Sequence, residues 1–207
     1  MRLTSLLAGL AFFALSAHGQ ADSLKTRSGR ISYTNYFGSG VLLGKDGRGT
    51  TASFSTVHGI RVKGFVLGLG TGYDDYNRAD LSDQMGYGYY MRWKVVPVFL
   101  SLSADWAKIR ENALFLQVNG GYSFIRPIKR DNANVVENSE GGLMLNPSLG
   151  YRIYSGKHRI YIGAGYKVQR NKYGYNPSPW IWGPPSPQIN VKETMQRMEV
   201  RIGFGWN

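Results

Sequence analysis

The chain lacks cysteine altogether and is poor in acidic residues, with 13 Asp and Glu against 25 Lys and Arg among its 207 residues. The absence of thiols excludes disulfides, thiolate metal sites and a lipid-modified cysteine anchor. The net charge of +12 would suit a nucleic-acid partner. We expect no such partner, however, because the first residues of the chain predict export.

Long apolar runs are also scarce, and the exception lies at the start of the chain. Arg2 precedes an apolar run over residues 3–17, which ends in the small residues Ala17 and Gly19. This is the pattern of a secretory signal peptide, here residues 1–19. The run is shorter than the ~20 apolar residues that a membrane-spanning helix needs. We therefore expect an exported protein without a transmembrane helix, of a length that suits one domain.

Glycine and tyrosine are abundant instead, with 27 and 14 residues, whereas helical periodicity is hard to find. Apolar residues alternate with polar or small ones along most of the chain, which is typical of half-buried β-strands. In the stretch VFLSLSADW, the residues at 98, 100, 102, 104 and 106 are apolar, and those at 101, 103 and 105 are polar. The sequence therefore predicts an all-β fold.

Eight strands of this kind are predicted after the signal peptide. They cover residues 30–43, 50–61, 65–76, 92–106, 113–125, 142–154, 158–171 and 196–206. Their lengths suit the ~9–11 residues that a tilted strand needs to cross a bilayer. Short and long connections alternate, as in bacterial outer-membrane barrels, in which periplasmic turns are brief and extracellular loops are long. Both chain ends would then be periplasmic, with residues 20–29 as a short segment before a barrel over 30–207.

A soluble eight-stranded barrel, such as a lipocalin, is the main alternative. Its apolar face would point inward around a ligand and its polar face outward to solvent. Here the other face is rich in glycine and serine and carries few charges, which suits a narrow barrel interior better than a solvent-exposed surface. We therefore predict an antiparallel, up-and-down transmembrane β-barrel in the bacterial outer membrane, monomeric and without a cofactor.

Five segments of the chain also resemble a known family. The segments TVHGIRVKGFVLGLGTGYDDY, VPVFLSLSADW, GGYSF, GGLMLNPSLGYRI and RIYIGAGYKVQ resemble the small outer-membrane β-barrel proteins of Bacteroidetes-type bacteria, in the size class of PorT, OmpA and OmpX. The resemblance implies fold and location, because these motifs are strand and turn patterns rather than chemical signatures. Some relatives act in protein secretion, so an accessory role in a secretion or surface-assembly system is the first alternative function.

Charged residues on the interior face are predicted to form a buried network, because charges in a narrow barrel persist only when they are paired and hydrogen-bonded. The predicted members are Asp105, Arg152, Arg159, Lys167, Glu199 and Arg201. Arg61 is a further candidate. Glu199 and Arg201 are expected to find partners on the preceding strand, where Lys167 and Gln169 lie. A proton or solute path is the alternative, against which the narrow bore argues.

Glycines and aspartates in the segment 68–83 are predicted to have structural roles. Glycines at positions 68, 70 and 72 share the interior face of one strand and are expected to make room for long charged side chains opposite. Aspartates at positions 74, 75, 80 and 83 follow, and are expected in one solvated extracellular loop. A calcium site is less favoured there, because the spacing does not match an EF-hand.

Histidine is the residue on which an enzymatic reading would depend. His58 and His158 are the histidines that follow the signal peptide. Outer-membrane enzymes of this size that modify lipids use histidine with serine or acidic partners near the extracellular rim. Both histidines are expected at the periplasmic end without such partners. We therefore predict no catalytic residues, and a lipid-modifying enzyme is the second alternative.

Basic residues near the extracellular strand ends are candidate contacts for lipopolysaccharide phosphate, with a generic solvated surface as the alternative. They are Arg92, Lys94, Arg126, Lys129, Arg130, Arg170 and Lys172. Aromatic residues are expected to form a girdle in the same zone: Tyr73, Tyr87, Tyr89, Tyr90, Trp93, Tyr173 and Tyr175. Trp106 and Trp206 are expected in a second girdle on the periplasmic side.

The last long connection, residues 173–194, contains the stretch NPSPWIWGPPSPQ with five prolines. Prolines reduce the entropy lost on binding, and exposed tryptophans commonly anchor interfaces. Trp180, Ile181 and Trp182 are therefore a candidate site for an envelope protein, with a lid over the barrel and an anchor in the outer leaflet as alternatives. The predicted function is a structural or interaction role, in which long loops contact lipopolysaccharide or such a partner.

Overall fold

The computed structural model describes residues 31–44, 50–78, 91–127, 136–175 and 189–206. These residues form nine strands: β1 (Ile31–Gly44), β2 (Thr50–Val62), β3 (Phe65–Arg78), β4 (Met91–Ile109), β5 (Asn112–Pro127), β6 (Val136–Glu140), β7 (Gly142–Ser155), β8 (His158–Tyr175) and β9 (Ile189–Trp206). Within these ranges no helix is long and apolar enough to span a membrane. The predicted signal peptide and the segment 20–29 lie outside the described residues.

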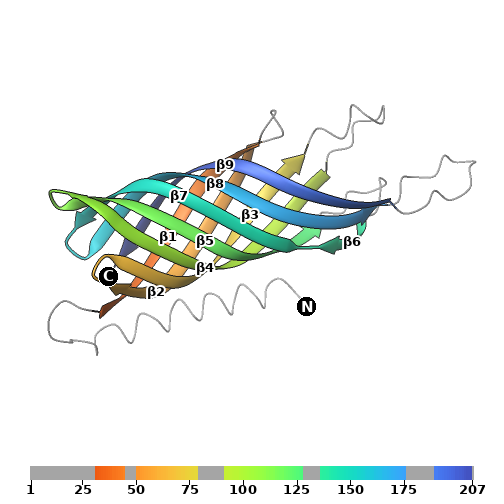
Figure 1. The fold of residues 1–207 in the computed structure, drawn as a ribbon. Coiled ribbons are helices and arrows are strands. Elements are labelled where there is room, and N and C mark those ends of the chain that lie inside the picture. The colour runs from red at the N-terminus through yellow and green to blue at the C-terminus, as the bar shows by residue number, and fades with distance from the viewer. Residues whose placement is uncertain (1–30, 45–49, 79–90, 128–135, 176–188, 207) are drawn as a thin grey trace, which may run out of the picture.

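The strands close into an antiparallel barrel (Figure 1). From β1 to β5 each strand pairs with the next, β5 pairs with β7, and β7 pairs with β8. The circle is completed because β9 pairs with both β8 and β1. The short β6 also pairs with β8 and is separated from β7 by Gly141 alone, so the two occupy one position in the barrel. The predicted eight-stranded barrel is therefore confirmed.

The two ends of the barrel differ in their connections. Tight turns at Lys63–Gly64, Arg110–Glu111 and Gly156–Lys157 join strands at one end, where β1 begins and β9 ends. We call this the turn end; in Figure 1 it lies beside the C-terminus. The opposite end, the loop end, carries the connections 45–49, 79–90, 128–135 and 176–188. Short and long connections thus alternate as the sequence predicts.

The two faces of the barrel wall have opposite character, as the alternation predicts. Outward side chains are large, apolar and exposed; on three strands they are Val98, Leu100, Leu102, Leu116, Val118, Met198, Val200, Ile202 and Phe204. Inward side chains at the intervening positions are polar and buried, among them Ser101, Ser103, Gln117, Asn119, Glu199 and Arg201. An apolar outer surface around a polar interior is the reverse of a water-soluble barrel and is the arrangement of transmembrane barrels.

Two apolar clusters fill parts of the interior. The loop-end cluster consists of Leu42, Tyr76, Trp93, Val95, Ile125 and Met195. The mid-barrel cluster consists of Tyr36, Val57, Phe99, Phe115, Met144 and Tyr161. Tyr161 meets the rings of Tyr36 and Phe115 edge-on, with centroids 5.6 and 6.0 Å apart, which is a favourable aromatic geometry.

Glycine makes room for the rings of the mid-barrel cluster. A Cβ atom at Gly70 would lie 2.3 Å from the Phe99 ring, and one at Gly203 would lie 2.1 Å from the Tyr161 ring. No side chain can occupy such a position without displacing the ring. The glycines of β3 were expected to accommodate charged side chains, and this is wrong for Gly70, whose neighbour is an aromatic ring.

Several strands are longer at the loop end than the apolar pattern predicts. β8 continues to Tyr175 rather than 171, and β9 begins at Ile189 rather than 196. The segment 136–140, expected in a long connection, pairs with β8 as β6. Backbone pairing continues past the apolar belt because the hydrogen-bond ladder does not depend on apolar outward side chains.

Candidate functional site

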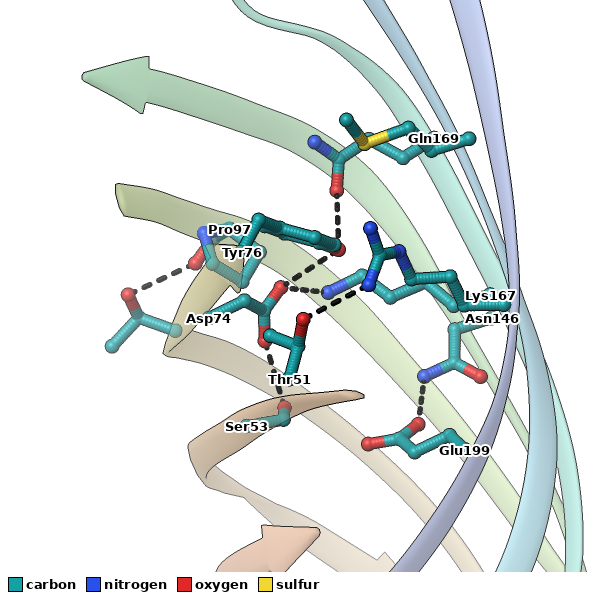
Figure 2. Close-up of polar contacts among 12 residues, drawn as sticks. Thr51, Ser53, Asp74, Tyr76, Pro97, Asn146, Lys167, Gln169 and Glu199 are labelled. Atoms are coloured by element: carbon teal, nitrogen blue, oxygen red, sulfur yellow. Dashed lines mark hydrogen bonds and ion pairs between the residues drawn. The ribbon is translucent and has the colours of Figure 1, made fainter. Parts of the chain in front are cut away.

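The loop-end half of the interior contains a buried ion pair between β3 and β8 (Figure 2). Lys167 donates to the Asp74 carboxylate, and the two residues are 4% and 1% exposed. Asp74 also accepts hydrogen bonds from Ser53 at 2.7 Å and from the Tyr76 hydroxyl at 3.5 Å. That hydroxyl lies 3.4 Å from Gln169 Oε1. The carboxylate thus has the partners that a buried charge requires.

The prediction of a solvated acidic loop is wrong for Asp74 and Asp75, since both lie on β3. Asp74 continues the interior face of this strand two residues beyond Gly72, whereas Asp75 lies opposite Lys94 on the outward face. Positions 80 and 83 lie outside the described residues. Following the parity of the strand past Gly72 would have placed Asp74 in the interior.

Glu199 and Arg201 lie inside the barrel and are 5% and 4% exposed, but they do not contact the residues expected. Glu199 accepts a hydrogen bond from Asn146 on β7, at 2.5 Å (Figure 2). Arg201 donates to Gln117 on β5 at 3.0 Å and to Ser148 on β7. The expected contacts with β8 are wrong, because strands in a barrel are tilted and staggered, and side chains meet across the interior at equal height rather than at adjacent strand positions.

A second ionic group occupies the turn end of the interior. Asp105 accepts from Arg61 at 2.5 Å and from Arg152, and the Tyr154 hydroxyl lies 2.9 Å from the same carboxylate. Arg152 also donates to Ser103 at 3.0 Å and lies over an aromatic ring of the mid-barrel cluster. The Asp105 and Arg152 side chains are each 4% exposed. One carboxylate therefore joins three strands, β2, β4 and β7.

Arg159 on β8 and Arg197 on β9 each have neutral groups among their partners. Arg159, only 2% exposed, donates from Nη2 to the main-chain oxygens of Asn35 and Trp206, each at 3.3 Å. Arg197 donates to Thr51 at 2.9 Å and lies with its guanidinium 4.2 Å from the centroid of an aromatic ring on β3. The structure thus places every predicted member of the charged network inside the barrel, although sequence reasoning missed Asp74 and Arg197 as buried members.

The histidines lie towards the turn end. His58 faces outward, with Nδ1 hydrogen-bonded to the Tyr33 hydroxyl at 2.6 Å and Nε2 3.3 Å from Thr56 Oγ1. His158 stacks on Phe204, with ring centroids 5.5 Å apart. The hydrogen bonds of His58 thus join it to a phenol and a hydroxyl.

Basic side chains of the loop end lie on the outward face. Lys94 lies directly opposite Arg126, and Lys172 lies opposite Lys192, each pair on adjacent strands. Arg126, Arg170, Lys172 and Lys192 are exposed. Lys172 also forms an exposed ion pair with Glu140 at 3.6 Å. Lys192 was not predicted, because the sequence reading began the last strand later.

Some predicted surface residues lie elsewhere or outside the description. Trp93 was expected in the girdle, and this is wrong: it is 1% exposed and belongs to the loop-end cluster, because its strand parity points inward. Trp106 is 68% exposed and lies at a β-bulge in β4. The candidate partner site at positions 180–182, the basic residues at 129 and 130, and the side chain of Arg92 lie outside what the structure describes.

Solved structures with the same fold were found by comparison. Neisserial surface protein A is 11% identical, with a TM-score of 0.55, and the match covers 86% of this chain and 99% of that one. The outer-membrane protein AlkL, solved in lipid bilayers, is 12% identical, with a TM-score of 0.51 over 87% of this chain and 92% of that one. Comparison with family models and with curated proteins gave no match.

The fold shared with these two proteins is that of small integral outer-membrane β-barrels. The apolar outer surface and the ionic interior described above are the features that this fold requires in a bilayer. Identities of 11% and 12% establish the architecture and nothing of the activity.

Proposed function

We propose that the protein is a structural or interaction component of the bacterial outer membrane, with both chain ends in the periplasm, and that it binds lipopolysaccharide phosphate through the loop end of its outer surface. It acts through its surfaces and not as an enzyme. The filled interior supports this proposal, because two apolar clusters and the ionic groups occupy it. The outer surface is then the part of the barrel that is available for binding.

The observation that carries the proposal is two like-charge cross-strand pairs at the loop end. Lys94 opposes Arg126, and Lys172 opposes Lys192, at directly paired positions of neighbouring strands. Asp75 on the other side of Lys94 and Glu140, in an exposed ion pair with Lys172, compensate part of this charge and leave each pair with a net positive charge. Like charges at such positions destabilise a sheet. An anion bound between the members of each pair would offset the repulsion through charge-assisted hydrogen bonds.

The position of these basic side chains relative to the bilayer indicates which anion they would bind. Phe124 is outward and 56% exposed, and Arg126 follows it on the same face of β5. The basic side chains therefore begin where the apolar belt ends, at the level of lipid headgroups. With long loops outside the cell, that level in the outer leaflet contains the phosphates of lipopolysaccharide.

Binding of lipid A to the folded protein in detergent micelles tests the proposal. We expect Lys94→Gln with Arg126→Gln, and separately Lys172→Gln with Lys192→Gln, to weaken binding by about fivefold for each charge removed. Dephosphorylated lipid A should bind wild type as weakly as lipid A binds the variants. The matched control is Lys63→Gln with Lys157→Gln at the turn end, which should bind normally. Unchanged affinity in both loop-end variants would contradict the proposal.

The kinship with the Bacteroidetes-type family and the envelope-protein partner stay predictions. The two likenesses on which the fold rests are below 13% identity, and the loop expected to hold the partner lies outside the described residues. Affinity capture with and without residues 177–187 is the direct test of that partner.

A further inference from the structure

The turn end carries a second basic rim, which the lipopolysaccharide proposal does not use. Lys63, Lys108, Arg110 and Lys157 are exposed there, and Glu111 is the one exposed carboxylate among the described turn residues. Three of the four cations lie in the two-residue turns themselves. The charge of this rim is thus strongly positive even though the barrel interior behind it already holds more cations than carboxylates.

Two of these cations occupy backbone positions that favour other residues. Lys63 and Arg110 have φ angles of 48° and 56°, in the left-handed region that glycine and asparagine adopt more readily. At Lys63–Gly64 both residues have positive φ, as in the type I′ hairpin turn, in which Asn-Gly is preferred. Backbone preference alone therefore does not account for a basic residue at either position.

Large apolar side chains surround the same turns. Phe65 and Trp106 are each 68% exposed, Ile31 is 69% exposed, and Ile109 is 48% exposed. Such exposure at the end of an apolar belt places these groups in the boundary region of a bilayer, where aromatic residues gather. Lys63 lies two positions before Phe65, and Arg110 follows Ile109 directly. These basic turn residues then lie at the phosphate level of the adjacent leaflet.

We infer that the turn-end rim is a binding surface for anionic phospholipid, with cardiolipin and phosphatidylglycerol as the chemical class. The inference uses the orientation proposed above, in which the turn end faces the periplasm and therefore contacts the phospholipid leaflet. A membrane surface is favoured over a soluble acidic partner because the cations lie beside large, exposed apolar side chains, which a bilayer would cover. The rim would hold the barrel at a fixed depth and enrich anionic lipid around it.

Native mass spectrometry of the protein in dodecyl maltoside micelles tests this inference, with tetraoleoyl cardiolipin and dioleoyl phosphatidylcholine as probes. Wild type should retain cardiolipin more tightly than phosphatidylcholine. The triple variant Lys63→Asn, Arg110→Asn, Lys157→Gln should lose cardiolipin affinity by about fivefold per charge. Asparagine tolerates positive φ, so the variant should be at least as stable as wild type. If it fails to fold, Lys63→Asn alone serves, since it creates the preferred pair with Gly64.

A matched control separates this site from general attraction. Lys157→Arg, which keeps the charge, should preserve cardiolipin affinity, and Lys94→Gln with Arg126→Gln at the loop end should lower it less than the triple variant does. The inference is overturned if the triple variant binds cardiolipin as wild type does, which is what a soluble acidic partner predicts, or if the loop-end control loses as much. Because micelles have no sidedness, a failure here would leave the lipid A result intact, and the reverse also holds.

Discussion

The buried pair of Lys167 and Asp74 gives the sharpest test of how the interior stabilises the barrel. Lys167→Met removes the ammonium and keeps most of the side-chain volume. Asp74 would then retain hydrogen bonds from Ser53 at 2.7 Å and Tyr76 at 3.5 Å, while its charge remains in a site that is 1% exposed. Two neutral donors do not replace a directly bonded ammonium group.

The expected magnitude follows from that burial. Removing one member of a buried ion pair costs about 3–5 kcal/mol, because the other charge is left uncompensated, whereas replacing both by neutral groups of similar size costs little. We therefore expect Lys167→Met to lower the free energy of unfolding by about 3 kcal/mol or more. Lys167→Met combined with Asp74→Asn should return to within about 1 kcal/mol of wild type, since the amide keeps the Ser53 contact.

Equilibrium unfolding in urea, followed by tryptophan fluorescence of the protein refolded into phospholipid vesicles, measures these differences through linear extrapolation. The matched control is Lys192→Met on the outer surface, where exposure to solvent predicts a change below about 0.5 kcal/mol. The reasoning would be refuted by a single variant as stable as wild type, or by a double variant that loses the sum of both single effects.

Two further substitutions test the interior. Gly70→Ala places a Cβ atom against the Phe99 ring, at 2.3 Å before relaxation, and should destabilise the barrel by about 1–3 kcal/mol; adding Phe99→Leu should recover most of the loss in the same unfolding assay. Asp105→Asn leaves Arg61 and Arg152 without their shared carboxylate and should cost about 3 kcal/mol. Adding Arg152→Met should recover part of this loss, and no recovery would argue against the pairing.

The faces of the strands could be predicted from the sequence because a strand alternates with a period of two residues. On β9 this rule alone assigns Met198, Val200 and Ile202 to the outside and Glu199 and Arg201 to the inside, as observed. The rule works wherever the apolar belt marks one face. On β3 the predicted interior face ended too early. Beyond the apolar belt the outward residues of this strand are polar too, so apolar and polar residues no longer alternate.

The pairing of interior charges could not be predicted in the same way. Lys167 was assigned to the interior, but its partner lies on β3, four positions around the wall in either direction if β6 and β7 count as one. Which residues meet across a barrel depends on the tilt and stagger of the strands. Those quantities follow from the pairing register of all strands together, and no single segment contains them. Asp74 was therefore missed as a partner for Lys167.

The charged residues that the structure describes fall into two groups, one inside the barrel and one at its two ends. Interior cations are held by carboxylates, hydroxyls, main-chain oxygens and aromatic rings. We interpret these paired charges as contributions to the stability of the fold. Other cations of the described residues lie on two rims, one beyond each end of the apolar belt. If the two lipid-binding proposals hold, phosphate of each leaflet meets one rim, and cations at both rims would stabilise the barrel at one depth in the membrane.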